Sequence, residues 1–369
     1  MSVKTTGPLL EFSEHVETLM EGLSAAVFVG DDLWVACDEL TSVERLSPDG
    51  CGGFGGQRSF ELHGPLKLPA FGEKKIDQEI DIEGLDFADG YLWLVGSHSV
   101  KRKKLSAGKH KNDTDEENID RLRKTEAEGN RYLLARVPVV RDDETGESVL
   151  AAASADGTLT AAQLPCTLTD SALTRAVLAD DEDGKPDRHL APWLRLPGKD
   201  NGFDIEGLAV AGGRVFLGLR SPVLRGWAVV LELSVEGGAG GELRLKKIGP
   251  KGRAYRKHFL DLGGLGVRSV NADGDDLLVI AGPPLTHDGP VRVFRWEGGA
   301  AVGAESVVWA DELGGPVLVV PHGEGADRAE GMVLVPGTKP PAVLVVYDAP
   351  SEARKVGGRA VRADIFDLS

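Results

Sequence analysis

A Glu-Gly pair at the head of an apolar run occurs three times in this chain. The copies are Asp81-Ile82-Glu83-Gly84-Leu85, Asp204-Ile205-Glu206-Gly207-Leu208 and Ala329-Glu330-Gly331-Met332. A fourth copy, at 266–270, carries Arg268 where the others carry glutamate. A recurring supersecondary unit places the same position of every copy at the same place around an axis. The repetition therefore predicts a repeat fold with a shared site.

The copies align on the glycine-containing turns that follow them, and a further copy upstream places Ser24 at the same position. The aligned positions are 24, 83, 206, 268 and 330, and their separations are 59, 123, 62 and 62 residues. Because 123 residues is close to two periods, a degenerate copy between Glu83 and Glu206 is one interpretation, and the other is that an inserted segment supplies part of the excess length. Residues 149–164 keep a faint trace of the pattern.

The runs are short, rich in Val, Leu, Ile and Trp, and separated by Gly, Asp and Pro, which is typical of strands and hairpins. Each repeat can supply four strands, and four-stranded repeats arranged radially form a β-propeller. We expect an all-β protein with a single β-propeller domain over 1–369, of six blades, with five as the alternative. The segment from Leu9 to Ser13 would supply the outer strand of the last blade and close the ring. Helices are expected at 115–128 and 170–179.

One charged segment interrupts the rhythm between the second and third strands of its repeat. This insertion, 99–130, begins with the basic run Lys101-Arg102-Lys103-Lys104 and continues into a mixed-charge stretch of helical composition. Charge blocks of this kind are usually solvated loops. The alternative is a basic flap over the mouth of the channel, and the sequence leaves both interpretations open.

Composition narrows the class of partner. The chain of 369 residues has a formal net charge of −16, whereas nucleic-acid binding depends on Lys and Arg neutralising phosphates. No apolar run reaches the length of a membrane span, and the first residues lack the apolar stretch of a signal peptide. Its three cysteines have no CxxC spacing, so neither a disulfide framework nor a zinc site is indicated. We expect a cytoplasmic protein that binds neither nucleic acid nor membrane.

The aligned charged residues would begin the innermost strands and point at the axis. Three converging carboxylates need partners, because an unpaired buried charge is costly. In one arrangement Glu83, Glu206 and Glu330 bind a divalent cation, Ca²⁺ or Mg²⁺, which prefers oxygen ligands. In the other, Arg268 neutralises part of the charge by pairing with carboxylates. A third interpretation is that the Glu-Gly turn recurs only because the connection between blades uses it.

A second set of polar residues follows the second strand of each repeat, where a strand leaves the core at the channel mouth. This set comprises Asp38, Glu39, His98, Arg220, Thr286, His287 and Asp348. Among them His98 and Asp348 could move protons, whereas Arg220 and Asp38 could bind substrate together with Arg268. Such an inventory suits metal-assisted hydrolysis, in which the ion lowers the pKa of a bound water and arginine stabilises developing negative charge.

The string Gly218-Leu219-Arg220-Ser221-Pro222-Val223-Leu224-Arg225-Gly226-Trp227-Ala228 resembles the signature of an uncharacterised bacterial family. The stretches 203–208, 263–268, 97–99 and 347–351 support the match, which extends over nearly the whole chain. The resemblance implies a propeller-like fold without a settled activity. This chain has Ser221 where glycine is expected and Ser269 where an acidic residue is common. The Glu-Gly-Leu motifs are also similar to those of phytase-like esterase propellers and calcium-dependent lactonase propellers.

Two functions are consistent with these residues. The first is metal-assisted hydrolysis of a small anionic ester, lactone or phosphoester at the central channel. The second is a non-catalytic propeller that binds a metabolite, peptide or protein at the channel mouth. Both imply a small anionic metabolite or a peptide as partner.

Overall fold

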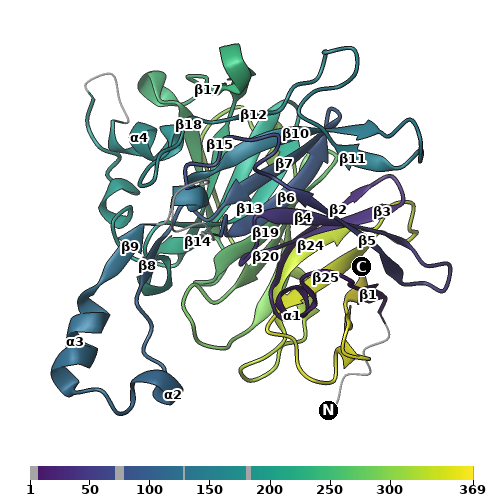
Figure 1. Ribbon diagram of the computed structural model, residues 1–369. Coiled ribbons are helices and arrows are strands. Elements are labelled where there is room, and N and C mark those ends of the chain that lie inside the picture. Colours follow the sequence, from purple (N-terminus) through teal and green to yellow (C-terminus); the bar gives the residue numbers. More distant parts are fainter. Residues whose placement is uncertain (1–6, 71–78, 128, 180–183, 369) are drawn as a thin grey trace.

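Five sheets radiate from one axis, as a β-propeller requires. The computed structural model describes residues 7–70, 79–127, 129–179 and 184–368. In each radial sheet one edge strand lies innermost, and these strands converge at the centre of the molecule (Figure 1). Each innermost strand contacts the next around the ring, in the order β2, β6, β13, β19, β24 and back to β2. The predicted all-β propeller is therefore confirmed.

Four of the radial sheets have four strands or more and are full blades. The first contains β2 (Leu23–Val29), β3 (Asp32–Cys37), β4 (Ser42–Pro48) and β5 (Phe54–Glu61). The second contains β6 (Ile82–Ala88), β7 (Tyr91–Gly96), β10 (Leu134–Arg141), β11 (Ser148–Leu150) and β12 (Ala162–Gln163). The third contains β13 (Asp204–Ala211), β14 (Arg214–Leu224), β15 (Trp227–Leu233), β18 (Tyr255–Asp261) and β22 (Ser306–Val308). The fourth contains β19 (Gly266–Asp273), β20 (Asp276–Gly282), β21 (Val291–Trp296) and β23 (Pro316–Val320).

The fifth radial sheet has three strands. It comprises β24 (Arg328–Leu334), β25 (Ala342–Asp348) and β28 (Asp364–Asp367). The prediction of six blades is therefore wrong, because the ring consists of four full blades and this smaller sheet. The alternative of five matches the number of innermost strands, although not the expectation of four strands in every repeat.

No innermost strand of a sixth blade lies between Glu83 and Glu206 in the described residues. The trace at 149–164 corresponds to β11 and β12, which both pair with β10 in the outer part of the second blade. The excess of residues between the two glutamates is taken up by the charged insertion and by the connections around α4 (Ala172–Leu178). The segment from Glu83 to Glu206 is therefore about two repeats long but forms only one blade.

The N-terminal strand joins the first sheet, not the last. β1 (Leu9–Glu11) lies between β5 and β27 (Ala360–Arg362), pairing parallel with the former and antiparallel with the latter. β26 (Lys355–Val356) forms the outer edge of this sheet. The two ends of the chain thus meet on the outside of the first blade, and among the described strands β1 does not pair with the three-stranded sheet.

Five apolar clusters hold the ring together, one between each pair of neighbouring sheets. Leu33 and Val346, for example, belong to the cluster between the first and fifth sheets, where the ring closes. Trp34, Trp93 and Trp296 are buried in such clusters, as expected for residues that pack one blade on the next. Each Å² of apolar surface removed from water stabilises the fold by about 25 cal/mol, so these interfaces are the main source of its stability.

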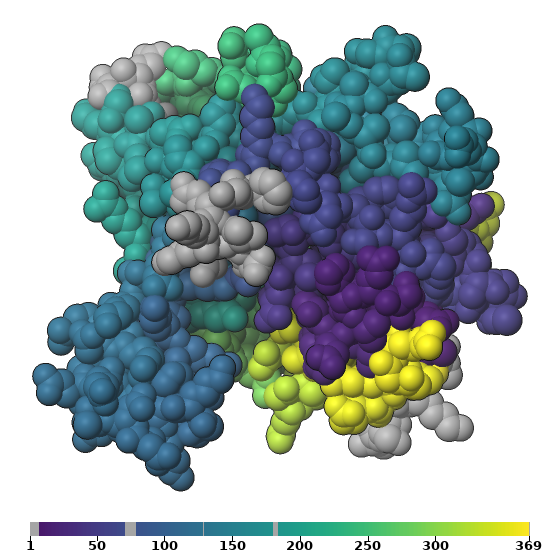
Figure 2. All heavy atoms as spheres, viewed as in Figure 1, coloured from purple at the N-terminus to yellow at the C-terminus, as the bar shows by residue number. Residues whose placement is uncertain are grey.

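The charged insertion forms an arm that projects beyond the rest of the molecule (Figure 2). It contains the hairpin of β8 (Val100–Arg102) and β9 (Thr125–Ala127), with α2 (Ala107–His110) and α3 (Asp115–Arg123) at its tip. A capping box formed by Thr114 and Glu117 begins α3. Together with α4, α3 confirms the two helical expectations, with shorter bounds than predicted.

The remaining elements connect the sheets. They are α1 (Val16–Glu21), the hairpin of β16 (Val235–Gly237) and β17 (Leu243–Leu245), and the short 3₁₀ turns η1 (Gly129–Tyr132), η2 (Ala191–Trp193), η3 (Gly198–Asp200), η4 (Ala239–Gly241), η5 (Pro250–Gly252) and η6 (Gly299–Ala301). Among the described helices none is long and apolar enough to cross a membrane.

Candidate functional site

The five aligned positions of the repeat all fall at the same irregularity of the fold. In every radial sheet the innermost strand shifts register against its neighbour at this position, so that the aligned residue has no direct partner. The residues are Ser24, Glu83, Glu206, Arg268 and Glu330. A β-bulge of this kind bends the strand and redirects a side chain. The sequence alignment therefore identified a structural position shared by all five sheets.

The small residue after each aligned position allows the next sheet to approach. A Cβ atom on Gly84 would lie 2.6 Å from Leu208 Cβ in the neighbouring sheet, and one on Gly207 would lie 2.9 Å from the Val270 backbone nitrogen. A Cβ atom on Gly331 would lie 3.0 Å from the Ala25 Cα atom, which belongs to the first sheet. The glycine of each Glu-Gly pair is thus required by packing between blades. The glutamate itself is not explained by this packing.

A chain of ion pairs links three of the innermost strands. Arg268 Nη1 lies 2.8 Å from Glu330 Oε1 and 3.1 Å from Glu206 Oε2. The other oxygen of Glu206 lies 2.5 Å from Arg220 Nη1, and Arg220 also pairs with Asp204. Arg268 further donates a hydrogen bond of 2.9 Å to the Pro283 carbonyl. The predicted neutralisation of the glutamates by Arg268 is present in the structure, with Arg220 as a second cation.

Acidic groups outnumber basic groups around the axis. This axial cluster contains the carboxyl groups of Asp38, Asp81, Glu83, Asp204, Glu206, Glu330 and Asp348, and the guanidinium groups of Arg131, Arg220 and Arg268. Among the described residues Glu83 has no ion-pair or hydrogen-bond partner for its carboxyl group. Burial, followed by the charges of Asp81 and Glu206, raises the pKa of Glu83 well above its ordinary value.

Three more carboxyl groups of the axial cluster have raised pKa values. Burial raises the pKa of Asp38 to about 7, assisted by the charges of Asp81 and Asp348. Burial also raises the pKa of Asp204 to about 6, although the Arg220 guanidinium opposes this shift. The pKa of Glu330 is raised mainly by burial and then by Asp348, with Arg268 acting in the opposite direction. Part of the axial charge is therefore neutralised by protons near neutral pH.

A pocket opens beside this cluster, between the fourth and fifth sheets. Its volume is about 590 Å³, open solvent at its mouth included. The polar and charged side chains that line it are Lys199, Arg220, Arg268, Thr286, His287, Asp288, His322, Arg328, Glu330 and Asp348. The pocket thus brings together two aligned residues, Arg268 and Glu330, and several members of the second predicted set. The described lining does not include Glu83, Glu206, Asp38 or His98.

Four cations and three carboxyl groups line this pocket in a chain whose net charge is −16. Arg328 pairs with Asp348 at 3.6 Å, and Gly325 donates a backbone hydrogen bond of 2.8 Å to Asp288, which ties together two loops of the rim. Lys199, Arg328 and His322 were not found from the sequence. Lys199 lies in the 3₁₀ turn η3 and His322 on the loop after β23, whereas Arg328 begins β24, two residues before Glu330; no pattern marked them.

His98 does not join the predicted acid–base set. Its side chain is buried, with Nδ1 2.9 Å from the Gly96 carbonyl oxygen and the Tyr132 ring beside it. Burial lowers the pKa of His98 to about 4, although the hydrogen bond to Gly96 opposes this shift. Its Nε2 atom is buried without a hydrogen-bond partner in the described residues. The imidazole is therefore neutral at physiological pH and lies apart from the pocket lining.

The glutamates do not form a metal-ligand group. No three His, Cys, Asp or Glu side chains of the described residues gather closely enough to hold a metal ion. Arg268 instead contacts Glu206 and Glu330, two of the three predicted ligands. The residues as placed do not fit a divalent cation, and a metal at Glu83, Glu206 and Glu330 stays a prediction.

Comparison with solved structures returns other proteins at low identity. The chain is similar to a streptogramin B lyase, with a TM-score of 0.35, 10% identity, and 97% of each chain covered. It is similar to a PQQ-bound aldose sugar dehydrogenase from Streptomyces coelicolor, with a TM-score of 0.35, 13% identity, and coverage of 98% and 99%. It is also similar to a xylan β-1,4-xylosidase from Bacillus halodurans C-125, with a TM-score of 0.37, 11% identity, and coverage of 95% and 53%. Likenesses this distant carry no argument about function.

Comparison with curated protein sequences finds no match. A family model does match, over residues 22–364, which takes in every aligned position of the repeat and the whole pocket lining. That family is described as "Protein of unknown function (DUF3616)". Its span exceeds half of the chain, and the chain therefore belongs to this family.

Proposed function

We propose that the protein hydrolyses a small anionic metabolite, such as an ester, lactone or phosphoester, in the pocket between the fourth and fifth sheets. The observation that carries the proposal is the pairing of Arg268 with Glu330 in the pocket lining. One residue offers positive charge to an anion, and the other offers a carboxyl group whose raised pKa lets it hold a proton. Anion binding and proton donation are the two functions that hydrolysis of such a molecule needs.

Each lining residue has a distinct role in this proposal. The guanidinium groups of Arg220 and Arg268 would bind the anionic group, since their orientation is fixed by the carboxylates behind them. Glu330 would donate a proton to the leaving group as a general acid. Asp348 would accept a proton from the attacking water as a general base. The exposed rim cation Lys199 would attract the anion from solution.

The test combines binding and turnover. Isothermal titration with phosphate, citrate and aryl phosphates, together with an assay on aryl esters, lactones and aryl phosphates, should reveal one productive anionic class. The variant Lys199→Ala should weaken binding of that class several-fold and make it less dependent on salt. The variant Lys251→Ala removes an equally exposed lysine of another 3₁₀ turn outside the pocket, and it should leave binding unchanged. Equal affinities for the two variants would contradict the proposed pocket.

A specific observation favours a second candidate, which is binding without catalysis. The described pocket lining contains no serine or cysteine, and no hydrogen bond joins its one hydroxyl side chain, Thr286, to a general base among the described residues. Both arginines are also already paired with carboxylates, which suits a rigid recognition site. High affinity for an anionic ligand, with no turnover of any tested ester, lactone or phosphate, would decide for this candidate.

A further inference from the structure

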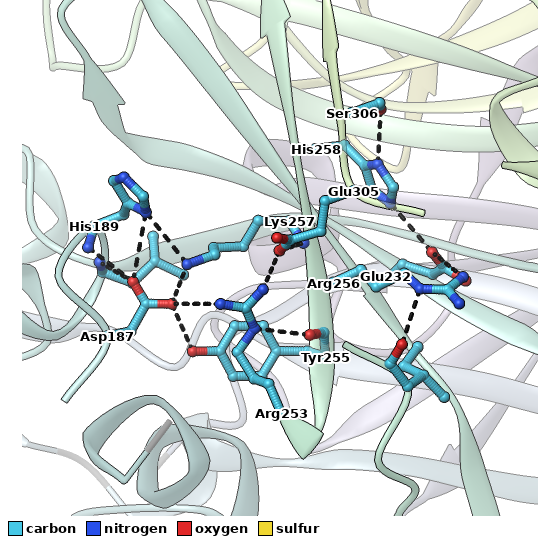
Figure 3. A network of polar contacts seen from close by, with 12 residues as sticks. Asp187, His189, Glu232, Arg253, Tyr255, Arg256, Lys257, His258, Glu305 and Ser306 are labelled. Atoms are coloured by element: carbon cyan, nitrogen blue, oxygen red, sulfur yellow. Dashed lines mark hydrogen bonds and ion pairs between the residues drawn. The ribbon is translucent and has the colours of Figure 1, made fainter. Parts of the chain in front are cut away.

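Three polar side chains form a hydrogen-bonded line on the outer strands of the third sheet, away from the pocket. They are Glu232 on β15, His258 on β18 and Ser306 on β22 (Figure 3). Ser306 Oγ lies 2.9 Å from His258 Nδ1, and His258 Nε2 lies 3.2 Å from Glu232 Oε2. This arrangement could not be predicted from the sequence, because 26 and 48 residues separate the histidine from its two partners.

The acid fixes the tautomer of the histidine. Burial tends to raise the pKa of Glu232, but the hydrogen bond from His258 and the charges of Arg256 and Arg214 outweigh it and lower the pKa. An ionised carboxylate can only accept hydrogen bonds, so the proton of a neutral His258 lies on Nε2. Its Nδ1 atom is then the unprotonated nitrogen and accepts the hydrogen bond from the Ser306 hydroxyl. This is the orientation in which an imidazole can take a proton from a serine.

We propose that Ser306, His258 and Glu232 form a second hydrolytic site, which acts on small carboxylic esters with an apolar acyl group. The roles are those of nucleophile, general base and orienting acid. His258 and Glu232 are fully buried, whereas Ser306 is only half-buried and begins its strand. The imidazole therefore lies beneath Ser306, and in this proposal a small molecule or a water reaches His258 Nδ1 only at the side of the serine hydroxyl.

Hydrolysis at Ser306 also needs donors for the oxyanion and a site for the acyl group, and the neighbouring residues offer both. β22 is the edge strand of its sheet and pairs only with β18 among the described strands. Its other edge has no strand partner among the described residues, and backbone N–H groups there would be the donors to an oxyanion in this proposal. The Trp296 ring lies beside the His258 ring, at 5.1 Å between centroids, and Trp296 and Val308 belong to one buried apolar cluster. Both of these side chains are buried, whereas the apolar Val307 and Trp309 that follow Ser306 in the chain are 50% and 56% exposed, and these two favour an apolar acyl group over a charged one.

The proposed reaction has two balanced steps. In the first, Ser306 Oγ bonds to the acyl carbon while its proton passes to His258 Nδ1, and the leaving alcohol takes that proton as its bond to the acyl carbon breaks. In the second, water attacks the acyl-serine and gives a proton to His258 Nδ1. The bond from the acyl carbon to Ser306 Oγ then breaks, and Oγ recovers the proton.

The same contacts could serve only to tie three strands together, and reactivity distinguishes the two roles. A fluorophosphonate probe phosphonylates an activated serine with loss of fluoride, so the wild-type protein should gain one adduct, mapped to Ser306 by peptide mass spectrometry. The variant Ser306→Ala should lose that adduct and the hydrolysis of p-nitrophenyl acetate. The matched control is Ser148→Ala, because Ser148 also begins an edge strand and is half-buried, but has no histidine partner in the described residues. The Ser148→Ala protein should be labelled at Ser306 at the wild-type rate.

The base and the acid are tested separately. The variant His258→Gln should slow labelling about 100-fold, the size of effect expected for loss of a general base. The variant Glu232→Gln should slow it as well, because its amide can donate to Nε2 and so move the proton to Nδ1. If one variant fails to fold, as judged by circular dichroism, the other decides the point. Absence of an adduct at Ser306, or equal labelling rates in the folded variants and the wild type, would show that the line is only structural.

Discussion

Arg268 Nη1 lies 2.8 Å from Glu330 Oε1 and 3.1 Å from Glu206 Oε2, so a cation of the fourth sheet joins acids of the third and fifth. Arginine at this repeat position is therefore no random departure from the Glu-Gly pattern. A glutamate in its place would add a further carboxylate to the axial cluster, where acids already outnumber arginines. The exception in the repeat is what allows the other copies to keep their glutamates.

Removing this cation should destabilise the fold. The variant Arg268→Met removes the cation paired with Glu330 and leaves Glu206 with Arg220 alone, and breaking a buried pair in this way costs about 3–5 kcal/mol. Its matched control is Arg295→Met, because Arg295 pairs with Asp273 and Asp276 at a more exposed site and should lose less than about 1 kcal/mol. Urea unfolding measures both. Equal losses would mean that Arg268 is not needed to hold the axial carboxylates.

The glycine of the Glu-Gly pair should be sensitive for a different reason. In Gly207→Ala the new Cβ atom would meet the Val270 backbone nitrogen at 2.9 Å, so the third and fourth sheets would have to separate. Overpacking of this kind costs about 1–3 kcal/mol. Gly303→Ala is the control, since a Cβ atom there meets nothing within 4 Å, and its stability should stay within about 0.5 kcal/mol of the wild type. Thermal unfolding of both variants checks the prediction.

Much of the centre of the molecule could be predicted from the sequence, because packing and charge repeat with the strands. Ser24, Glu83 and Glu330 were aligned by their turns alone, and each lies at the bulge of its sheet. The blade count failed because residue spacing was taken as a measure of blades. The 123 residues between Glu83 and Glu206 include an arm and long connections, whose lengths no repeat constrains.

The pocket was predicted only in part, for the same reason. Arg220 and Asp348 lie on repeated strands and could be found, whereas Lys199 lies in the 3₁₀ turn η3 and His322 on the loop after β23, both outside the repeated motif. His98 was placed in the same set because its position after a strand resembles theirs. A left-handed backbone conformation at φ 54° and burial beside Tyr132 separate its ring from the pocket lining. Neither feature has a signature in the sequence.

Asp38 should make stability depend on pH. Its pKa is about 7 in the folded protein and near 3.8 in an unfolded chain, so the folded state holds the proton more tightly. The stabilisation that the tighter proton binding gives the folded state is fully present below about pH 3.8 and is lost as the pH rises through 7. The neutral variant Asp38→Asn should therefore be more stable than the wild type at pH 8, by on the order of 2 kcal/mol after allowance for partial exposure, and should match it near pH 4.

Urea unfolding across this pH range tests the sign. Asp49 provides the opposite case, because hydrogen bonds from the backbone of Cys51 and Gly53 lower its pKa. Asp49→Asn should thus lose stability at pH 8, where Asp38→Asn gains it. A gain that did not vanish near pH 4 would indicate that the Asp38 carboxyl acts through packing and not through its proton.

Glu330 should separate binding from turnover in the proposed reaction. Because burial and Asp348 raise its pKa and so favour the protonated form, glutamine is the closest substitute for Glu330 in charge and shape, and Glu330→Gln should keep the fold. Its amide oxygen can still accept the hydrogen bond from Arg268, so ligand affinity should persist. An amide cannot donate a proton to a leaving group, and kcat should fall by about 10²–10⁴-fold with KM little changed.

The control is Glu324→Gln, on an exposed neighbouring loop outside the pocket lining, which should leave both kcat and KM unaltered. Because a general acid must be protonated, wild-type activity should decline as the pH rises through the pKa of Glu330. Unchanged kcat in Glu330→Gln would exclude this carboxyl as the acid and leave Arg268 as the part of the pair that acts on the ligand.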